Sequence, residues 1–436
     1  MPSGLNKPEN ESYSKSPTMG LPFAVGFYFA FRTFIVLLSV RLLGMDPRTG
    51  TGINLACDYL LFLLAAFSAL GEARIPLSQM AKIPSIRWAL FFLGFSGCSM
   101  LWSSTASLST SIAYWCGMAA DLAIVTILLR SESLTSVTES LMKGYVWGAC
   151  LVGALAWLMP AQSDLRLGDD ELLGANSIGY VCAFAFFFAQ YLLREKRERV
   201  GLQALFLAIT VLRTLSKTTI VAFLVGEGFL LIRDKSISRK NRIVILLTAT
   251  AAVAALWGLL TAYFETYTNT STGNQSETLT GRLGIWAYIL TEAVQRPWIG
   301  HGFDSVWNVI PPFGPDKFEA PHAHNELIQQ FYAYGIAGVG LFAAIYGSLY
   351  RQIRKLAAGP FKTFCLAFLI FVLVRGLADT ERFDLSLPLW AIVMLSLLIE
   401  HARALQDKAA TFMAVEPLPL TLIPRHSPFV PKAPAG

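Results

Sequence analysis

Charged residues are scarce in this sequence, and their scarcity argues against a soluble protein. Only 15% of the 436 residues are Asp, Glu, Lys or Arg, whereas an ordinary soluble protein has about 25%. Hydrophobic residues make up 54% of the chain, and the mean hydropathy is +0.51. The net charge of +6 does not indicate a nucleic-acid partner, because membrane topology first distributes basic residues among loops. The composition predicts an integral membrane protein.

The usual metal and redox motifs are also missing. The six cysteines lie in or beside apolar runs without CxxC spacing, which favours small packing residues over a disulfide or metal framework. No HExxH motif occurs, and no DxD motif stands on a predicted outer loop. His322 and His324 with Glu326 come closest to a zinc pattern. No third histidine is near in sequence, so we favour no metal and no cofactor.

Apolar runs predict an all-α polytopic membrane protein with about twelve transmembrane helices. Residues 1–20 show no small-residue cleavage site before the first run, so we expect a disordered N-terminus followed by a retained first helix. The predicted spans lie near residues 22–40, 53–70, 88–102, 112–130, 141–159, 174–193, 200–214, 217–232, 243–263, 324–350, 361–376 and 384–400.

The distribution of Lys and Arg predicts that both termini are cytoplasmic. With an even number of spans the termini share one side, and most of the 35 Lys and Arg residues then fall in cytoplasmic segments such as 194–199 and 233–242. Residues 401–436 end in a proline-rich stretch, so we expect a disordered cytoplasmic tail there.

One large loop is predicted on the periplasmic side, between spans 9 and 10, over residues 264–323. Loops of this length are usually functional or disordered. Its second half has amphipathic helical spacing at Leu283, Trp286, Ile289 and Leu290. We expect this part to lie folded on the outer face, because Trp and Tyr suit the membrane interface.

The segment HAHNELIQQFYAYGIAGVG, from residue 322, places a polar cluster at the mouth of the tenth span. His322 and Glu326 are four residues apart, so they share one face of a helix. Polar groups are expensive in a membrane and are usually kept for a ligand, a pathway or a helix contact. The plainer alternative is that His324 and Asn325 merely begin the helix in the wet interface. The sequence also leaves His322 open between substrate contact and helix cap.

Cations gather on the same predicted face. Arg213 and Lys217 flank a short hairpin, and Arg282 and Arg296 lie in the large loop. Either hairpin residue alone is equally well explained as an interface anchor. As a set, these residues predict an anion site for a lipid phosphate or diphosphate, because guanidinium groups bind phosphate bidentately and Lys adds a point charge. Asn176 follows an acidic loop and is either a helix N-cap or part of this site.

Four sequence elements occur in a characteristic order: LLGANSIGY, LSKTT, GRLGIWAYIL with RPWIGHGF, and HNELIQQFYAYGIAG. In their order, hydropathy and large loop, residues 20–400 resemble the O-antigen polymerase and ligase superfamily. The resemblance is greatest to ExoQ-type (Wzy-type) exopolysaccharide polymerases. Each element alone is weak, but the ordered set is specific. The last element fits the family pattern at His324, Asn325, Gly335 and Gly338.

The resemblance implies a metal-independent, membrane-embedded glycosyltransferase that acts on an undecaprenyl-diphosphate-linked oligosaccharide. Carried over by position, His324 would be the general base for the acceptor hydroxyl, and Arg282 would bind the leaving diphosphate. Lys217 stands where the hairpin motif typically has Arg, so Arg213 is the substitute for the second phosphate contact. We expect the substrate to be bound by Arg213, Arg296, His322, Asn325, Glu326 and Asn176.

We therefore expect a bacterial inner-membrane polysaccharide polymerase with a periplasmic active site and a transmembrane domain over residues 21–400. It would transfer the glycan, with inversion, onto a lipid-linked repeat unit. The same site would serve an O-antigen ligase that transfers the glycan to lipid A core. A non-enzymatic alternative is a flippase or transporter of lipid-linked oligosaccharides. Besides its substrate and membrane lipid, the expected partner is a chain-length regulator or co-polymerase.

Overall fold

The computed structural model describes residues 20–70, 75–131, 133–162, 165–169, 172–235, 237–255, 280–305 and 322–415, with isolated positions between 258 and 266. The predicted N-terminal segment 1–19, most of the polar first half of the large loop and the tail 416–436 lie outside the described residues.

Helices dominate the part of the chain that the structure describes, where an isolated bridge between Asp169 and Leu173 is the only β-pairing. The predicted all-α polytopic architecture is confirmed. The elements are α1 (Leu21–Arg41), α2 (Pro47–Ser68), α3 (Leu77–Met80), α4 (Pro84–Ser99), α5 (Leu108–Ser131), α6 (Leu134–Leu158), α7 (Ala175–Glu195), α8 (Gly201–Arg213), α9 (Lys217–Arg233), α10 (Arg239–Ala255), α13 (Thr280–Ala293), α14 (Glu326–Lys355), α15 (Pro360–Gly376) and α16 (Leu389–Val415).

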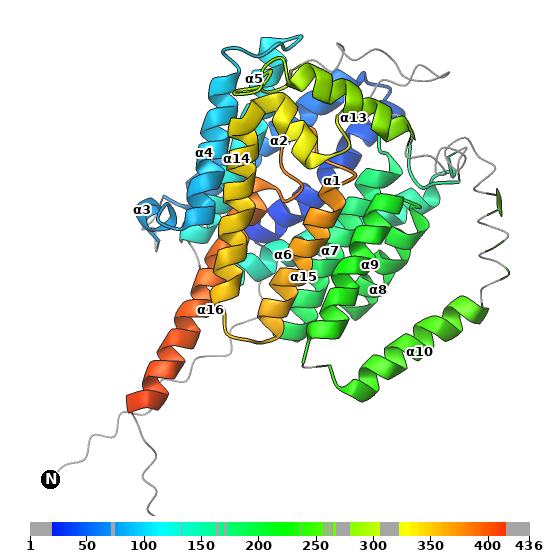
Figure 1. Cartoon of the computed structure of the whole chain (residues 1–436), viewed down its shortest axis with the longest axis vertical. Helices are drawn as coiled ribbons and strands as arrows, with labels where there is room; N and C mark the ends of the chain where they lie inside the picture. Colours follow the sequence, from blue (N-terminus) through cyan, green and yellow to red (C-terminus); the bar gives the residue numbers. More distant parts are fainter. Residues whose placement is uncertain are drawn as a thin grey trace, which may run out of the picture.

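Seven of these helices, α1, α2, α5, α6, α7, α14 and α16, are long and apolar enough to cross a membrane. Shorter helices, including the apolar α8, stand beside them in the bundle (Figure 1). Each of the twelve predicted runs contains a helix, while the count of twelve spans stays a prediction.

The bundle is held most closely together between α1 and α6, where glycines let the two backbones touch. A Cβ atom added to Gly26 would lie 1.9 Å from the Leu141 carbonyl oxygen, and one added to Gly144 would lie 2.0 Å from that of Phe23. Gly148, four residues after Gly144, meets Phe27 in the same way. This small-xxx-small spacing lets membrane helices pack by close backbone contact.

Many of the residues that were predicted to bind substrate or act in catalysis lie at one end of the bundle. Here α7, α9 and α14 begin while α8 and α15 end, and we call this the site end. In Figure 1 α13 lies across it at the top. Helix α13 packs through Ile285, Ile289 and Ala293, and Trp286 Nε1 donates to the Ala323 carbonyl at 2.9 Å. The amphipathic part of the large loop is therefore a helix that lies across the site end, as Figure 1 shows. Two of its predicted inward residues, Leu283 and Leu290, are exposed.

Two helices depart from the bundle. Helix α16 runs well past its lower end to Val415, whereas the tail was expected to begin at residue 401 (Figure 1). The sequence between 401 and 415 has no proline, and the helix continues because nothing in it removes a backbone donor. Helix α10 stands apart from the bundle in the same view.

A kink in α14 lets the loop after α13 pair with the backbone of this helix at the site end. Gly335 has φ of +61° and ψ of −155° inside the helix, a conformation open to glycine. The kink frees backbone groups that pair with the loop after α13: Ile336 N donates to Pro297 O at 2.7 Å, and His301 N donates to Tyr332 O at 3.0 Å. Gly335 therefore admits this loop, whereas glycine spacing in a span usually indicates the close approach of a neighbouring helix.

Candidate active site

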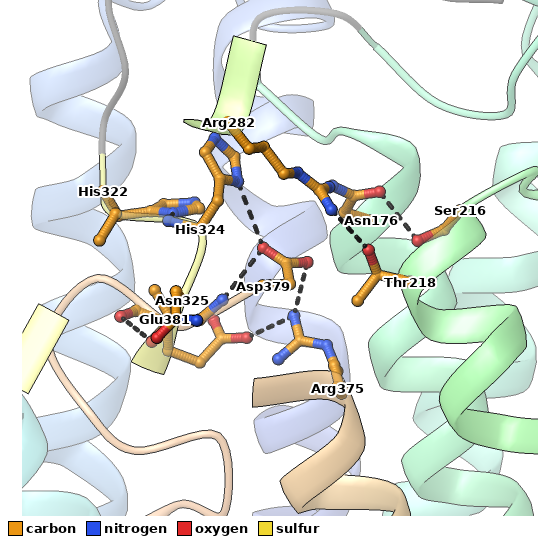
Figure 2. A network of polar contacts seen from close by, with 12 residues as sticks. Asn176, Ser216, Thr218, Arg282, His322, His324, Asn325, Arg375, Asp379 and Glu381 are labelled. Carbon is orange, nitrogen blue, oxygen red and sulfur yellow. Dashed lines mark hydrogen bonds and ion pairs between the residues drawn. The ribbon is translucent and has the colours of Figure 1, made fainter. Parts of the chain in front are cut away.

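The start of α14 positions His324. Asn325 is the N-cap, whose side-chain oxygen accepts from Ile328 N at 3.0 Å while its amide donates to Leu377 O at 2.8 Å. His324 has φ of +48°, a left-handed backbone conformation that is uncommon in non-glycine residues and is found at functional sites. The cap and this turn direct the His324 ring to the loop that follows α15 (Figure 2).

A chain of charges begins at His324 and runs into the bundle. Its Nδ1 lies 3.6 Å from Asp379 Oδ1. Asp379 Oδ2 is 3.2 Å from an Arg375 guanidinium nitrogen, which is 3.0 Å from Glu381 Oε1. The Arg375 guanidinium also lies 4.0 Å from the centre of the Tyr180 ring. With Arg375 2% exposed and Asp379 3% exposed, this chain holds the carboxylate that faces His324 rigidly in place.

The surroundings set the protonation states of the Asp379 and His322 side chains. Burial alone would raise the pKa of Asp379, but the Arg375 guanidinium and the two histidines hold it well below its usual range. Burial lowers the pKa of His322 to about 3, and the charges of His324, Arg375 and Arg382 act in the same direction. Asp379 is therefore a lasting negative charge, and His322 stays neutral at physiological pH.

Arg282 of α13 reaches the same region from the other side. One of its guanidinium nitrogens donates to Thr218 Oγ1 at 3.1 Å, in the first turn of α9. Burial lowers the pKa of Arg282, and the negative charge of Asp379 opposes that shift. Figure 2 shows Arg282, His324 and Asp379 next to one another. The structure thus brings together His324 and Arg282, which were predicted to act on one substrate, and it adds Asp379 as the carboxylate partner of the histidine.

Asn176 joins the start of α7 to the hairpin between α8 and α9. Its side-chain oxygen accepts from Ser216 Oγ at 2.8 Å and from an Arg166 guanidinium nitrogen at 2.6 Å. Arg166 also acts electrostatically on Arg282. The sequence assigned no role to Arg166, yet the structure places it among the cations of the site end.

Lys217 is exposed at the first position of α9, directly after the N-cap Ser216. The start of a helix presents free backbone N–H groups and a partial positive charge, which favour anions. Lys217 and Arg282 therefore flank one helix terminus, through the contact of Arg282 with Thr218.

Three of the residues expected to bind substrate form contacts with other parts of the protein. Arg213 donates to Leu165 O at 2.7 Å and lies over the Trp157 ring at 5.9 Å. Arg296 is directed to Trp102 O at 3.4 Å. Glu326 is 1% exposed, and its Oε1 accepts from Ser386 N at 2.8 Å. It therefore faces the bundle interior, where it anchors the loop before α16.

Among the described residues, His322, His324 and Asp379 form a trio that could hold a metal ion, with one ligand atom of each within 4.8 Å of the others. The trio fits a resident divalent cation poorly. Its one carboxylate is already paired with Arg375, and Arg282 lies close by. An added cation would face this positive charge, so the arrangement favours a direct histidine and aspartate pair.

Sequence reasoning missed Asp379, Glu381 and the role of Arg375. Arg375 lies inside the predicted span 361–376, where the sequence shows no other charge after Lys362. The available signal was the stretch RGLADTERFD at the end of the eleventh predicted span, where Arg375 and Asp379 are spaced to meet on a helix end. Nothing in the sequence tied this stretch to His324.

Two comparisons with known proteins each find a match to O-antigen ligases. Residues 202–343 match the family model described as O-Antigen ligase. The chain is 25% identical over 338 residues to an O-antigen ligase of Pseudomonas aeruginosa, and the alignment covers 73% of this chain and 78% of that protein. The matched family segment contains Arg213, Lys217, Arg282 and His324. With its multi-pass helical architecture, the chain resembles the superfamily of O-antigen polymerases and ligases.

Proposed function

We propose that the protein transfers a glycan from a lipid diphosphate to a sugar hydroxyl, with His324 as the general base. The observation that carries this proposal is the pairing of His324 with the buried Asp379, 3.6 Å apart, next to Arg282. A fixed negative charge beside one imidazole nitrogen favours the proton there and leaves the other nitrogen free to accept.

The reaction is a single displacement with inversion. The acceptor oxygen bonds to the anomeric carbon of the donor, while the bond from that carbon to the diphosphate oxygen breaks. The hydroxyl proton passes to His324, and Asp379 stabilises the resulting imidazolium. The bonding electrons leave with the diphosphate, whose growing negative charge Arg282, Lys217 and the α9 N-terminus stabilise.

For the acceptor we propose a second lipid-linked repeat unit, which makes the protein a polysaccharide polymerase. The four ordered sequence elements support this choice. A ligase that uses lipid A core is the second candidate, because both the matching family and the Pseudomonas aeruginosa relative carry that name.

We further propose that the site end is periplasmic, in a bacterial inner membrane with both termini cytoplasmic. The support is the distribution of charge, since Arg194, Arg233, Arg239 and Lys355 lie at the opposite helix ends. An undecaprenyl chain on the donor, a glycosyltransferase domain over residues 21–400 and a co-polymerase partner belong to the same proposal.

Reconstitution tests the proposal. Purified protein in liposomes is given lipid-diphosphate-linked repeat units and excess EDTA, and product length is read on a gel. A ladder supports the polymerase, and one larger product formed only with lipid A core supports the ligase. If lipid crosses the bilayer while no product forms with either acceptor, the protein is a flippase and the proposal fails.

Two variants probe the assigned roles in that assay. His324→Ala should reduce the rate by at least about 100-fold because the base is lost, and Arg282→Ala by about 100-fold because one diphosphate contact is lost. His401→Ala in α16 and Arg351→Ala in α14 are the matched controls and should retain the activity. Both residues lie farther along their helices, away from the site end. Equal losses in variants and controls would contradict the roles.

A further inference from the structure

A small polar hollow lies beside the His324 segment. It is lined by the loop after α13, by the first turns of α14 and by the loop before α16, with Phe303, Asp304, Gln329, Gln330, Arg382 and Phe383 among its lining residues. We call it the acceptor hollow. Its free volume is about 20 Å³, which has room for one water molecule or one hydroxyl group.

The acceptor hollow is joined directly to the proposed catalytic residues. Gln329, in its wall, accepts from Ala323 N at 3.0 Å, and Ala323 stands between the two histidines. Arg382, in another wall, follows the Asp379 loop and acts electrostatically on His322. A group bound in the hollow is therefore held at the edge of the catalytic site.

One buried polar atom in the hollow has no partner. Gln330 is 3% exposed, and its Oε1 accepts no hydrogen bond from any described residue. A buried carbonyl left this way costs about 1–3 kcal/mol, so such atoms are usually satisfied by ordered water or by a ligand. The missing partner must be a donor, because an amide oxygen only accepts.

Two further polar residues of the hollow, Asp304 and Arg382, form an ion pair. Asp304 has φ of +50°, and its carboxylate accepts from Ser111 Oγ at 2.8 Å and lies 3.5 Å from an Arg382 nitrogen. Arg382 is half exposed, at 49%, so it can also donate to a group entering from solvent. The hollow thus offers acceptors and a donor within one small space.

An aromatic wall completes the hollow. Phe383 stacks on Tyr114 with ring centres 4.4 Å apart and contacts Phe303 at 5.6 Å. The Arg382 guanidinium lies over the Phe383 ring at 5.0 Å. A binding site made of aromatic faces and a few convergent polar groups suits a ligand that is apolar on its faces and polar at its edges.

We propose that the acceptor hollow receives a hydroxyl of the acceptor sugar, with Gln330 accepting from it and Arg382 donating to it. This inference rests on the proposed glycan transfer, and it holds for a lipid-linked repeat unit and for lipid A core alike. A hydroxyl fits because it both donates and accepts. A phosphate does not fit, because it would face the Asp304 carboxylate and leave the Gln330 oxygen unpaired.

The test separates acceptor binding from chemistry. The probe is a methyl glycoside of the acceptor oligosaccharide, which lacks a diphosphate and can act only as acceptor. In Gln330→Met and in Arg382→Gln, its Kd without donor and its KM should rise about 10-fold, as expected for one lost hydrogen bond to a buried group. The kcat and the donor KM should stay within about twofold. Gln203→Met, at the start of α8 and so at the opposite end of the bundle from the site end, and Arg351→Gln are the matched controls.

A deoxy series of the methyl glycoside identifies the hydroxyl. The wild-type protein should discriminate against one deoxy analogue by about 10-fold, and Gln330→Met should lose that discrimination. Unchanged acceptor Kd in both variants, or loss of kcat without change in KM, would overturn the inference and leave the hollow with a buried water only. If the methyl glycoside binds and the variants weaken it while no product forms, the hollow stands and the proposed transfer fails.

Discussion

At the scale of single residues, the two histidines differ because their surroundings differ. His324 faces Asp379, whose charge Arg375 preserves. His322 is held neutral by burial and by the cations around it, with a pKa of about 3. An imidazole with so low a pKa is a weak proton acceptor. His324 is therefore the histidine that we expect to take the acceptor proton, and His322 shapes the site beside it.

Asp379→Asn tests the role of the carboxylate. The amide keeps the shape and removes the charge that would stabilise a protonated His324. We expect kcat to fall at least about 100-fold, with the donor KM little changed because Arg282 is intact. Initial rates in liposomes measure this. Asp407→Asn, on the exposed far end of α16, is the control. A variant as fast as the wild type would show that His324 acts without this partner.

His322 should make stability depend on pH. Its pKa is about 3 in the folded protein and about 6.5 when unfolded, so the unfolded chain binds the proton first as the pH falls. Burial of neutral His322 therefore takes nothing from the free energy of unfolding above about pH 6.5. As the pH falls from there toward 3, the free energy of unfolding decreases progressively. The unfolding midpoint in detergent should drop between pH 7 and pH 5 less steeply in His322→Gln than in the wild type or in His401→Gln. Parallel curves would contradict the assignment.

At the scale of elements, the kink of α14 and the loop after α13 depend on each other. A Cβ atom on Gly335 would lie 2.5 Å from the Pro297 oxygen, and one on Gly300 would lie 2.4 Å from Tyr334 N. Both glycines also have positive φ. His301 stacks on Tyr332 at 4.5 Å and lies 3.1 Å from Glu292 O. The motif RPWIGHGF is thus a structural clamp that holds α13, and with it Arg282, over the site.

Gly335→Ala should loosen this clamp. The strain of a positive φ costs about 1–3 kcal/mol, and contact with the Pro297 backbone adds to it. We expect a lower unfolding midpoint and reduced transfer. Gly340→Ala is the control five residues further along α14, where a Cβ atom meets nothing within 4 Å and alanine favours the helix. A loss as large in Gly340→Ala would point to helix propensity and not to the clamp.

The sequence predicted the helices well and their contacts poorly, for a physical reason. Each apolar run reports only the burial of its own side chains, so each of the twelve runs marked a helix. Some bounds were wrong, since α6 begins at Leu134 and α16 ends at Val415, and the short α3 was not predicted. The contact of Asp379 with His324 joins two loops that are far apart in the chain and depends on how α14 and α15 pack. The kink at Gly335 was not predicted, because glycine spacing within a span is equally typical of helix packing.

At the scale of the whole molecule, the site end is formed by the termini of several helices. Chain direction alternates from helix to helix, so residues near 41, 176, 213, 282, 324 and 379 meet there. The positions of Lys and Arg predicted the same alternation of chain direction. The candidate residues could therefore be assigned to one side of the membrane before any contact between them was known. Which side of the membrane this end faces is a separate matter from the fold.

Cysteine labelling settles that orientation. In a background lacking the six native cysteines, Ser109→Cys at the site end and Ser238→Cys at the opposite end are both exposed positions. A maleimide that cannot cross the membrane should label Ser109→Cys in intact cells with a permeable outer membrane, and Ser238→Cys only after lysis. The reverse pattern would place the site end in the cytoplasm. The proposed donor would then have to be used before it crosses the membrane, so the orientation decides whether this protein acts after or before export of its substrate.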